Sequence, residues 1–229
     1  MIYDLGIVVC AVPIGAARHH LRDIAAGFKL YCQSSNPTFI GDCIKPTVSY
    51  RIEVVTESDI PCNDMSTFNK SKYLNLGIKR CLSDCSIIVQ TDIDFLVPPY
   101  LIDLTAIDTR DTHMWVRSRY IKMAEITGDW KSYMKLPFWY NCPGSWNAMS
   151  ADNWRKVGGF DERCCYGWGA EDNILHRRIA EAGITTVAIS NVPLCHIEHK
   201  PRAWFTHGQR GRQNKTFMQG VQPNFLEGA

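Results

Sequence analysis

The sequence predicts an α/β fold, a single domain with a mostly parallel central sheet flanked by helices. In the first half of the chain, apolar runs typical of buried strands alternate with segments of helical spacing, which indicates βαβ units. The chain has 229 residues, the length of one large domain or two small ones, and no segment has the composition of a linker. Hydrophobic residues make up 45% of it, which is enough to form a core and excludes a mainly disordered chain.

The first half is predicted to contain three strands and two helices. Leu5 to Val12 is almost continuously apolar, as in a strand that is buried on both faces. Ile87 to Val89 is a further strand, and it runs straight into Asp92 and Asp94. The other predicted elements are a helix within 18–32, a strand over 48–55, and a helix that includes Leu74 to Leu82 and is capped by Ser66 or Thr67.

The second half is less regular. Residues 125–147 are rich in Trp, Tyr, Pro and Gly, so we expect a long loop with functional potential there. From Lys200 onward the chain is polar and basic. The predicted elements of this half are a strand over 114–116, a helix over 170–182 that ends at Gly183, and a strand over 185–189.

Charge and composition exclude several classes of protein. The formal net charge of +2 is too small for a protein whose affinity comes mainly from neutralising phosphates, so we expect no nucleic-acid partner. No run approaches the ~18–20 apolar residues of a membrane span, so we expect no integral membrane segment. The ten cysteines form no CxxC motif and lie mostly in apolar runs, which predicts reduced core residues and a reducing compartment.

Two aspartates follow the third predicted strand. If the segment is extended, Asp92 and Asp94 face the same side. They would lie at the carboxyl end of a buried strand, where open α/β sheets bind ligands. Such a pair suits a hard divalent cation that also holds phosphate oxygens, and the alternative is a pair of turn or cap aspartates.

A His-x-x-His pair is formed by His196 and His199. If the segment turns, both imidazoles reach one ion, and histidine suits Mn²⁺, Zn²⁺ or Fe²⁺ better than Mg²⁺. Surface histidines beside the basic tail are the alternative. Cys195 adds the option of a structural zinc site, although no second cysteine pair has the required spacing.

A glycine-flanked tryptophan precedes two acids at the start of the predicted helix 170–182. Trp168 could present its ring to a sugar, and Glu171 and Asp172 fall in the first turn of the helix. The helix dipole favours acids there for stability alone, which is the structural alternative. The dipole also keeps a carboxylate ionised, which a general base requires, so the sequence favours a functional site.

Four motifs in the same order resemble those of the β-1,4-galactosyltransferase-like glycosyltransferases, a family with the Rossmann-like GT-A fold. Residues 68–77 read FNKSKYLNLG and resemble that family's FNRAKLLNVG, and residues 92–94 resemble its DVD metal motif. Residues 167–173 are similar to its GWGGEDD loop, and 195–199 are similar to its CRMIRH. Similar motifs occur in N-acetylgalactosaminyltransferase and bacterial polysaccharide polymerase domains, so the donor sugar stays open.

The resemblance implies inverting transfer of a hexose or N-acetylhexosamine (Gal, GalNAc, Glc or GlcNAc) from a UDP-sugar to a saccharide or glycoconjugate acceptor. It implies Asp172 as the general base and Asp94, His196 and His199 as ligands of a divalent cation. The acceptor-binding residues that it implies are Glu171, Trp168 and Asn173. The donor-binding residues that it implies are Asp92, Pro13, Arg18, Lys72, Asn75, Gly144, Trp146 and Gly169.

The sequence also departs from the family. Ala170 replaces the second glycine of the loop and Asn173 replaces an aspartate, so the acceptor need not be N-acetylglucosamine. His196 stands where the family has a methionine, which gives an all-imidazole face and favours Mn²⁺. A non-catalytic nucleotide-sugar or glycan-binding module on the same fold is the alternative, but the expected base and ligands are all present.

Within one domain over 1–229, we expect a nucleotide-binding half over 1–97, an acceptor and donor-sugar half over 98–199, and a basic tail over 200–229. Because stem and anchor are missing from the sequence, we predict a cytoplasmic protein of bacterial or phage type, with peripheral membrane association as an option. A Golgi luminal domain trimmed of its anchor is the second choice.

Overall fold

A computed structural model describes residues 3–10, 46–56, 58–60, 68–109, 111–122, 125, 130–138, 144–164, 170–197 and 223–228. The elements in chain order are β1 (Tyr3–Cys10), β2 (Tyr50–Val55), α2 (Lys70–Cys81), β3 (Cys85–Asp92), β4 (Phe95–Leu96), α3 (Pro99–Asp108), β5 (His113–Val116), β6 (Arg119–Ile121), α4 (Trp130–Tyr133), β7 (Trp146–Ser150), α5 (Ala151–Val157), α6 (Glu171–Glu181), β8 (Thr186–Ile189) and β9 (Cys195–Ile197).

A six-stranded central sheet has the strand order β2-β1-β3-β7-β5-β8. β1 pairs in parallel with β2 and β3, and β5 pairs in parallel with β8. β7 runs antiparallel to both β3 and β5, because Trp146 enters the sheet opposite Thr91, at the edge where β3 leaves it. The predicted α/β fold is therefore confirmed, and β7 makes its sheet a mixed one.

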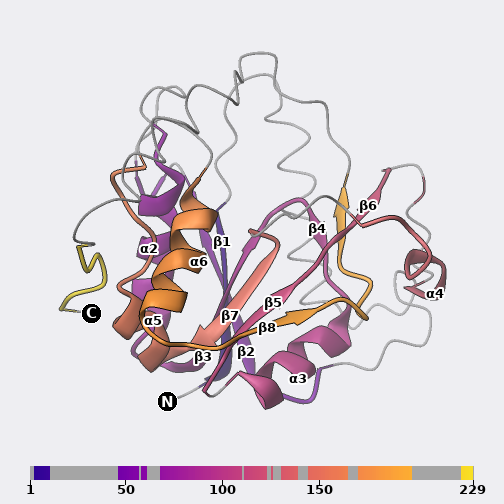
Figure 1. Ribbon diagram of the computed structural model, residues 1–229, viewed down its shortest axis with the longest axis horizontal. Coiled ribbons are helices and arrows are strands. Elements are labelled where there is room, and N and C mark those ends of the chain that lie inside the picture. The colour runs from indigo at the N-terminus through magenta and orange to yellow at the C-terminus, as the bar shows by residue number, and fades with distance from the viewer. Residues whose placement is uncertain are drawn as a thin grey trace.

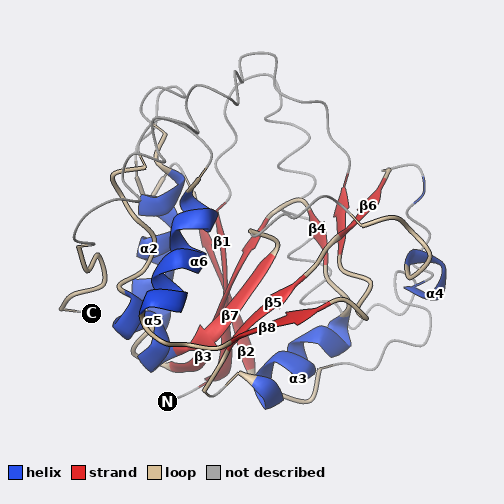
Figure 2. Ribbon diagram, viewed as in Figure 1, coloured by secondary structure: helices blue, strands red, loops and turns tan. Residues whose placement is uncertain are grey.

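Helices cover both faces of this sheet (Figures 1 and 2). On one face, α2, α5 and α6 bury a core that includes Val8, Ile88, Leu74 and Trp154. On the other face, α3 packs through Leu101 and Ile102 against the alternate residues of the same strands. Because β1 and β3 contribute to both cores, the middle of each strand is a continuous apolar run, as the sequence predicted.

A second, three-stranded sheet in the order β4-β9-β6 lies beside the carboxyl end of β3. β4 pairs with β9 antiparallel, with Phe95 opposite His196, and β6 pairs with β9 in parallel. The backbone N–H of Ile197 also donates to the carbonyl oxygen of Asp94 at 2.8 Å. This small sheet therefore joins the segment after β3 to the segment that contains the predicted His pair.

Several sequence-based expectations need correction in their details. The second strand begins at Tyr50 rather than at residue 48. Helix α2 begins at Lys70, and its cap is Asn69, whose side chain accepts a hydrogen bond from the N–H of Lys72 at 3.1 Å. The proposed caps Ser66 and Thr67 and the predicted helix within 18–32 lie outside the described residues.

The segments around the predicted site also differ from expectation. β3 ends at Asp92, and residues 93–94 form a turn, so the two aspartates are not two alternate residues of one extended strand. Residues 125–147 are not one loop, because they include α4 and the start of β7. Helix α6 and its end at Gly183, with φ of +70°, agree with the prediction.

Candidate active site

Three carboxylates gather around one buried lysine at the end of β3. Lys70 Nζ lies 2.9 Å from Oδ1 and 3.1 Å from Oδ2 of Asp92, and 3.4 Å from Oε1 of Glu171. Asp172, the next residue of α6, also acts electrostatically on Lys70. We call Lys70, Asp92, Glu171 and Asp172 the lysine-centred cluster. It forms where the first turns of α2 and α6 meet the end of β3.

The local sequence explains why these ends meet. The amide of Asn69, the α2 cap, donates to the carbonyl oxygen of Glu162 at 2.6 Å. Nearly two turns later, Asn75 accepts from the N–H of Phe160 at 2.8 Å and donates to its carbonyl oxygen at 2.9 Å. These bonds hold the segment that leads to α6 against α2. Ala170 caps α6 with φ of +73°, a backbone conformation that is strained for a residue with a side chain.

Burial and charge determine the protonation of this cluster. Burial alone would lower the pKa of Lys70, but Asp92, Asp172 and Glu171 raise it well above its usual value, so the ammonium stays charged. Burial raises the pKa of Asp172 to about 8, with Lys70 opposing the shift and Glu171 and Asp92 adding to it. Asp172 is therefore a carboxyl group that can take up a proton near neutral pH.

Gly144 lies directly against the Asp172 carboxylate. A Cβ atom at residue 144 would overlap Oδ2 of Asp172 and would lie 2.9 Å from Oδ1. Only glycine therefore fits at this position with the carboxylate where it is. Oδ1 of Asp172 is buried and has no hydrogen-bond partner among the described residues. The sequence-predicted residues Gly144 and Asp172 thus lie side by side.

Asp94 and His196 form a second group beside this cluster, which we call the metal corner. Nε2 of His196 lies 3.2 Å from Oδ2 of Asp94, and both residues are largely buried. The β4–β9 ladder fixes this approach, and Phe95 packs edge-to-face against the imidazole with ring centroids 5.0 Å apart. Burial raises the pKa of Asp92 against the effect of Lys70, and Asp94 adds to the rise, so the metal corner and the lysine-centred cluster interact electrostatically.

The geometry of the metal corner fits a divalent cation. In an octahedral site with bonds of about 2.1 Å, adjacent ligand atoms are about 3 Å apart, which matches the Asp94–His196 separation. One carboxylate oxygen and one imidazole nitrogen suit Mn²⁺. The third predicted ligand, His199, lies outside the described residues, and those residues include no group of three or more potential ligands.

Cys195 does not share this corner. Successive side chains of β9 alternate, so Cys195 points to the face opposite His196 and packs with Ile121, Tyr133 and Ile197. Burial raises the pKa of its thiol to about 12, which opposes metal ligation by thiolate. A structural zinc site built on Cys195 is therefore not supported. Cysteines 10, 81, 85, 164 and 195 are all free.

The remaining predicted residues take different positions. Trp146 is fully buried and its indole N–H donates to Thr105 Oγ1 at 3.1 Å, so its side chain belongs to the core. Asn75 is also buried and acts between α2 and Phe160. Lys72 and Asn173 have exposed side chains near the starts of α2 and α6. Pro13, Arg18, Trp168, Gly169 and His199 lie outside the described residues.

Sequence reasoning missed Lys70 as a site residue. A signal for it was present, because lysine is unfavourable at the first position of a helix, where the dipole favours acids. Asn69 caps α2 immediately before it, and no acid lies in the first turn of α2. A cation at this position needs nearby carboxylates, and the structure supplies them from β3 and α6.

No helix in the described part of the chain is long and apolar enough to cross a membrane.

Residues 131–200 match a family model described as the N-terminal domain of galactosyltransferase. Human β-1,4-galactosyltransferase 3 is 25% identical over 182 residues, which is 76% of this chain, and the bovine protein of the same name matches equally. The chain spans 37% of the length of these curated relatives.

Solved structures of galactosyltransferases are similar to this chain in fold. The catalytic domain of Drosophila β-1,4-galactosyltransferase 7, in complex with xylobiose, superimposes with a TM-score of 0.55 at 16% identity. The match covers 90% of this chain and 79% of that one. A mutant of the same enzyme, in complex with manganese, UDP-Gal and xylobiose, gives a TM-score of 0.53 at 14% identity over the same shares. The chain therefore has the GT-A fold, and its resemblance to the β-1,4-galactosyltransferase-like glycosyltransferases is confirmed.

Proposed function

We propose that the protein is a metal-dependent, inverting glycosyltransferase that moves a hexose or N-acetylhexosamine from a UDP-sugar to a saccharide acceptor. The observation that carries this proposal is the approach of Asp94 and His196 to 3.2 Å beside a buried carboxylate cluster. The relatives named as galactosyltransferases and the neighbour complexed with manganese and UDP-Gal support the same chemistry. We further propose that residues 1–97 bind the nucleotide and 98–199 the sugars.

Asp94 and His196, together with the predicted ligand His199, would hold the cation, for which Mn²⁺ is the best candidate. When bound, the cation supplies Lewis acidity that stabilises the leaving diphosphate. Asp92 pairs with Lys70 and interacts electrostatically with Asp94, so we assign it to the donor side of the site. The cytoplasmic location also stays a prediction.

Asp172 is the proposed general base. It takes the proton of the acceptor hydroxyl while that oxygen forms a bond to the anomeric carbon of the donor. The bond from the anomeric carbon to the β-phosphate oxygen breaks, and its electron pair leaves with UDP. Attack from the side opposite the leaving group inverts the anomeric configuration. Glu171 is buried beside Asp172 and Lys70, and we propose that it orients the acceptor.

The experiment is a calorimetric titration of the metal-free protein with UDP, with and without Mn²⁺. We expect binding that needs Mn²⁺, and then turnover of one of UDP-Gal, UDP-GalNAc, UDP-Glc or UDP-GlcNAc, measured as UDP release with an oligosaccharide acceptor. Binding of UDP-sugar without any release of UDP, across a broad acceptor panel, would favour the non-catalytic binding module. Failure to bind UDP under both conditions would overturn the proposal.

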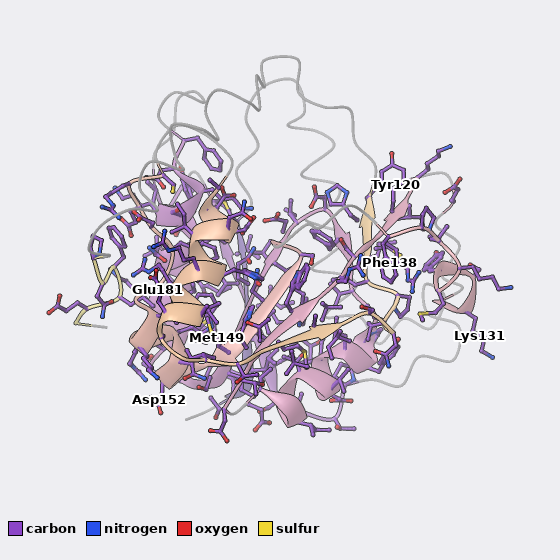
Figure 3. The ribbon with its side chains drawn as sticks, in the orientation of Figure 1. Tyr120, Lys131, Phe138, Met149, Asp152 and Glu181 are labelled. Carbon is purple, nitrogen blue, oxygen red and sulfur yellow. The ribbon has the colours of Figure 1, made fainter. Side chains whose placement is uncertain are left out.

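A matched control for aspartate variants is available in the same protein. Asp152 lies on α5, its side chain is 94% exposed, and it forms only a surface ion pair with Arg155 in the described part of the chain. Figure 3 shows Asp152 at the outer end of α5, away from the start of α6. Asp152→Asn should therefore leave UDP binding and turnover unchanged.

A further inference from the structure

A buried polar chain crosses the sheet behind the lysine-centred cluster. Gln90 on β3, Asn147 on β7 and His113 on β5 are each fully buried. Gln90 lies directly opposite Asn147 in the β3–β7 ladder, and β5 is the next strand. All three side chains lie on the face of the sheet that α6 covers. Three buried polar residues side by side are costly unless their hydrogen bonds are made.

Hydrogen bonds connect this chain to Gly144. Nε2 of Gln90 lies 3.3 Å from the Gly144 carbonyl oxygen, and Nδ2 of Asn147 lies 2.9 Å from Oε1 of Gln90. Oδ1 of Asn147 lies 3.0 Å from Nε2 of His113 and 3.0 Å from Nε2 of His176 on α6. The chain therefore joins three strands, one helix and the backbone that faces Asp172.

The Gly144 carbonyl oxygen, at one end of this network, determines which group donates in every hydrogen bond that follows. A carbonyl oxygen can only accept, so Gln90 donates to Gly144 and must accept from Asn147. The remaining oxygen of Asn147 then accepts from Nε2–H of His113 and from Nε2–H of His176. Neutral His113 is consistent with this arrangement, since burial and the neighbouring His176 lower its pKa to about 4.

The two ends of this network lie near Asp172 in different ways. One end is the Gly144 backbone, which leaves no room for a Cβ beside the carboxylate. The other is His176, which lies one turn after Asp172 on α6 and therefore on the same side of the helix. The ring of His176 is fixed further by edge-to-face packing with His113 at 4.9 Å and Trp115 at 5.6 Å.

We propose that Gln90, Asn147 and His176 are positioning residues that hold α6 and the Gly144 backbone at one fixed spacing, and that this spacing places the Asp172 carboxylate. The inference rests on the proposed function only where it concerns turnover. Loss of the chain would let Gly144 and α6 move relative to each other. A misplaced base should lower kcat and leave the affinity for Mn²⁺ and UDP unchanged, because the metal corner is held by a different sheet.

The test uses Gln90→Met, which keeps the length of the side chain and removes its hydrogen bonds. We expect kcat to fall about tenfold to a hundredfold with an unchanged KM for the donor. We also expect the Gly144 amide resonance and the carboxyl ¹³C resonance of Asp172 to shift in NMR spectra, and these readouts need no turnover. Asp172→Asn assigns the carboxyl signal.

A second pair of variants covers the case in which Gln90→Met does not fold. His176 is partly exposed, so His176→Phe should fold, and it removes one donor to Asn147. His176→Gln keeps an N–H donor and should restore both the Asp172 resonance and kcat. Asn147→Asp cannot donate to Gln90 and should shift the resonance as Gln90→Met does, whereas Asn153→Asp on α5 is the matched control and should not.

The outcomes separate this inference from the proposed function. Unchanged Gly144 and Asp172 resonances in folded Gln90→Met, or in His176→Phe, would overturn the positioning role. Shifted resonances in a protein that transfers no sugar in its wild-type form would support the positioning role and overturn the transferase proposal. Equal effects of His176→Phe and His176→Gln would contradict the role of the donor bond.

Discussion

The metal corner and the lysine-centred cluster lie side by side but are built in different ways. The metal corner rests on a short three-stranded sheet and brings together one carboxylate and one imidazole. The cluster rests on the ends of two helices and the central strand β3, and it contains three carboxylates with one cation. The first arrangement suits binding of a cation, and the second suits holding and moving a proton. The difference teaches that one end of a sheet can hold two polar groups side by side, one built by strand pairing and one by the starts of helices.

Removal of the proposed base should give the largest effect. Asp172→Asn keeps the shape of the side chain but cannot take a proton, so kcat should fall by about 10²–10⁴-fold. Because the metal corner is intact, the Mn²⁺-dependent affinity for UDP should change little. Initial rates and calorimetry measure the two quantities separately. Near-normal turnover of the pure variant would contradict the assignment, and Asp152→Asn is the control.

Removal of the positive charge of Lys70 from the lysine-centred cluster should mainly affect the stability of the fold. Lys70→Met leaves Asp92, Glu171 and Asp172 without their buried partner, and the free energy of unfolding should fall by about 3–5 kcal/mol. Urea denaturation at neutral pH measures this change. The loss should shrink at acidic pH, where the carboxylates are protonated. Lys79→Met, on the exposed side of α2, is the matched control, and an equal loss there would contradict the role of Lys70.

Removal of an imidazole from the metal corner should affect the cation and spare the base. His196→Ala should weaken Mn²⁺ binding by about a hundredfold, since it removes one of the proposed ligands. The affinity for UDP in the presence of Mn²⁺ should fall with it, as calorimetry can show. Glu171→Gln, in the neighbouring cluster, should leave Mn²⁺ affinity unchanged. Loss of Mn²⁺ binding in both variants would mean that the two regions are one site.

The two regions also differ in how much of them the sequence could predict. Glu171 and Asp172 are neighbours at a helix start, and Asp92 and Asp94 follow an apolar strand, so local patterns were sufficient. Lys70 was missed because its meaning depends on carboxylates far away in the chain, 22 positions later in the case of Asp92. A local rule against lysine at a helix start was the available signal.

The polar residues of the sheet were missed for a related reason. Gln90 follows directly after the predicted strand 87–89, and Asn147 ends the segment 125–147 that was predicted as a loop, so the local pattern assigned neither residue to a buried position in the sheet. The pairing of these residues depends on the position of β7 between β3 and β5, which follows from the antiparallel return of the chain. The fold class follows from local pattern, whereas the partners of buried polar groups follow only from strand order.

The pH dependence of turnover should give the smallest but most specific difference between the two regions. Because the pKa of Asp172 is raised to about 8, the base is mostly protonated at pH 7 and mostly ionised at pH 9. We therefore expect kcat/KM to rise about tenfold between these values, with an apparent pKa near 8. Glu171→Gln removes one negative neighbour, so this limb should move to lower pH. A limb in the ordinary carboxyl range, between about pH 4 and 5, would contradict a buried base.

The same pKa shift carries a consequence for stability of opposite sign. The native state holds the Asp172 proton up to about pH 8, whereas the unfolded chain releases it near its ordinary value of 3.8. The native state thus binds more protons between these values, and the contribution of Asp172 to stability is complete below the lower one and is lost as pH rises through the upper one. Urea denaturation of wild type and Asp172→Asn across this range should show a slope that the variant lacks. An equal slope in both proteins would assign the pH dependence of stability to other groups and leave Asp172 with an ordinary pKa.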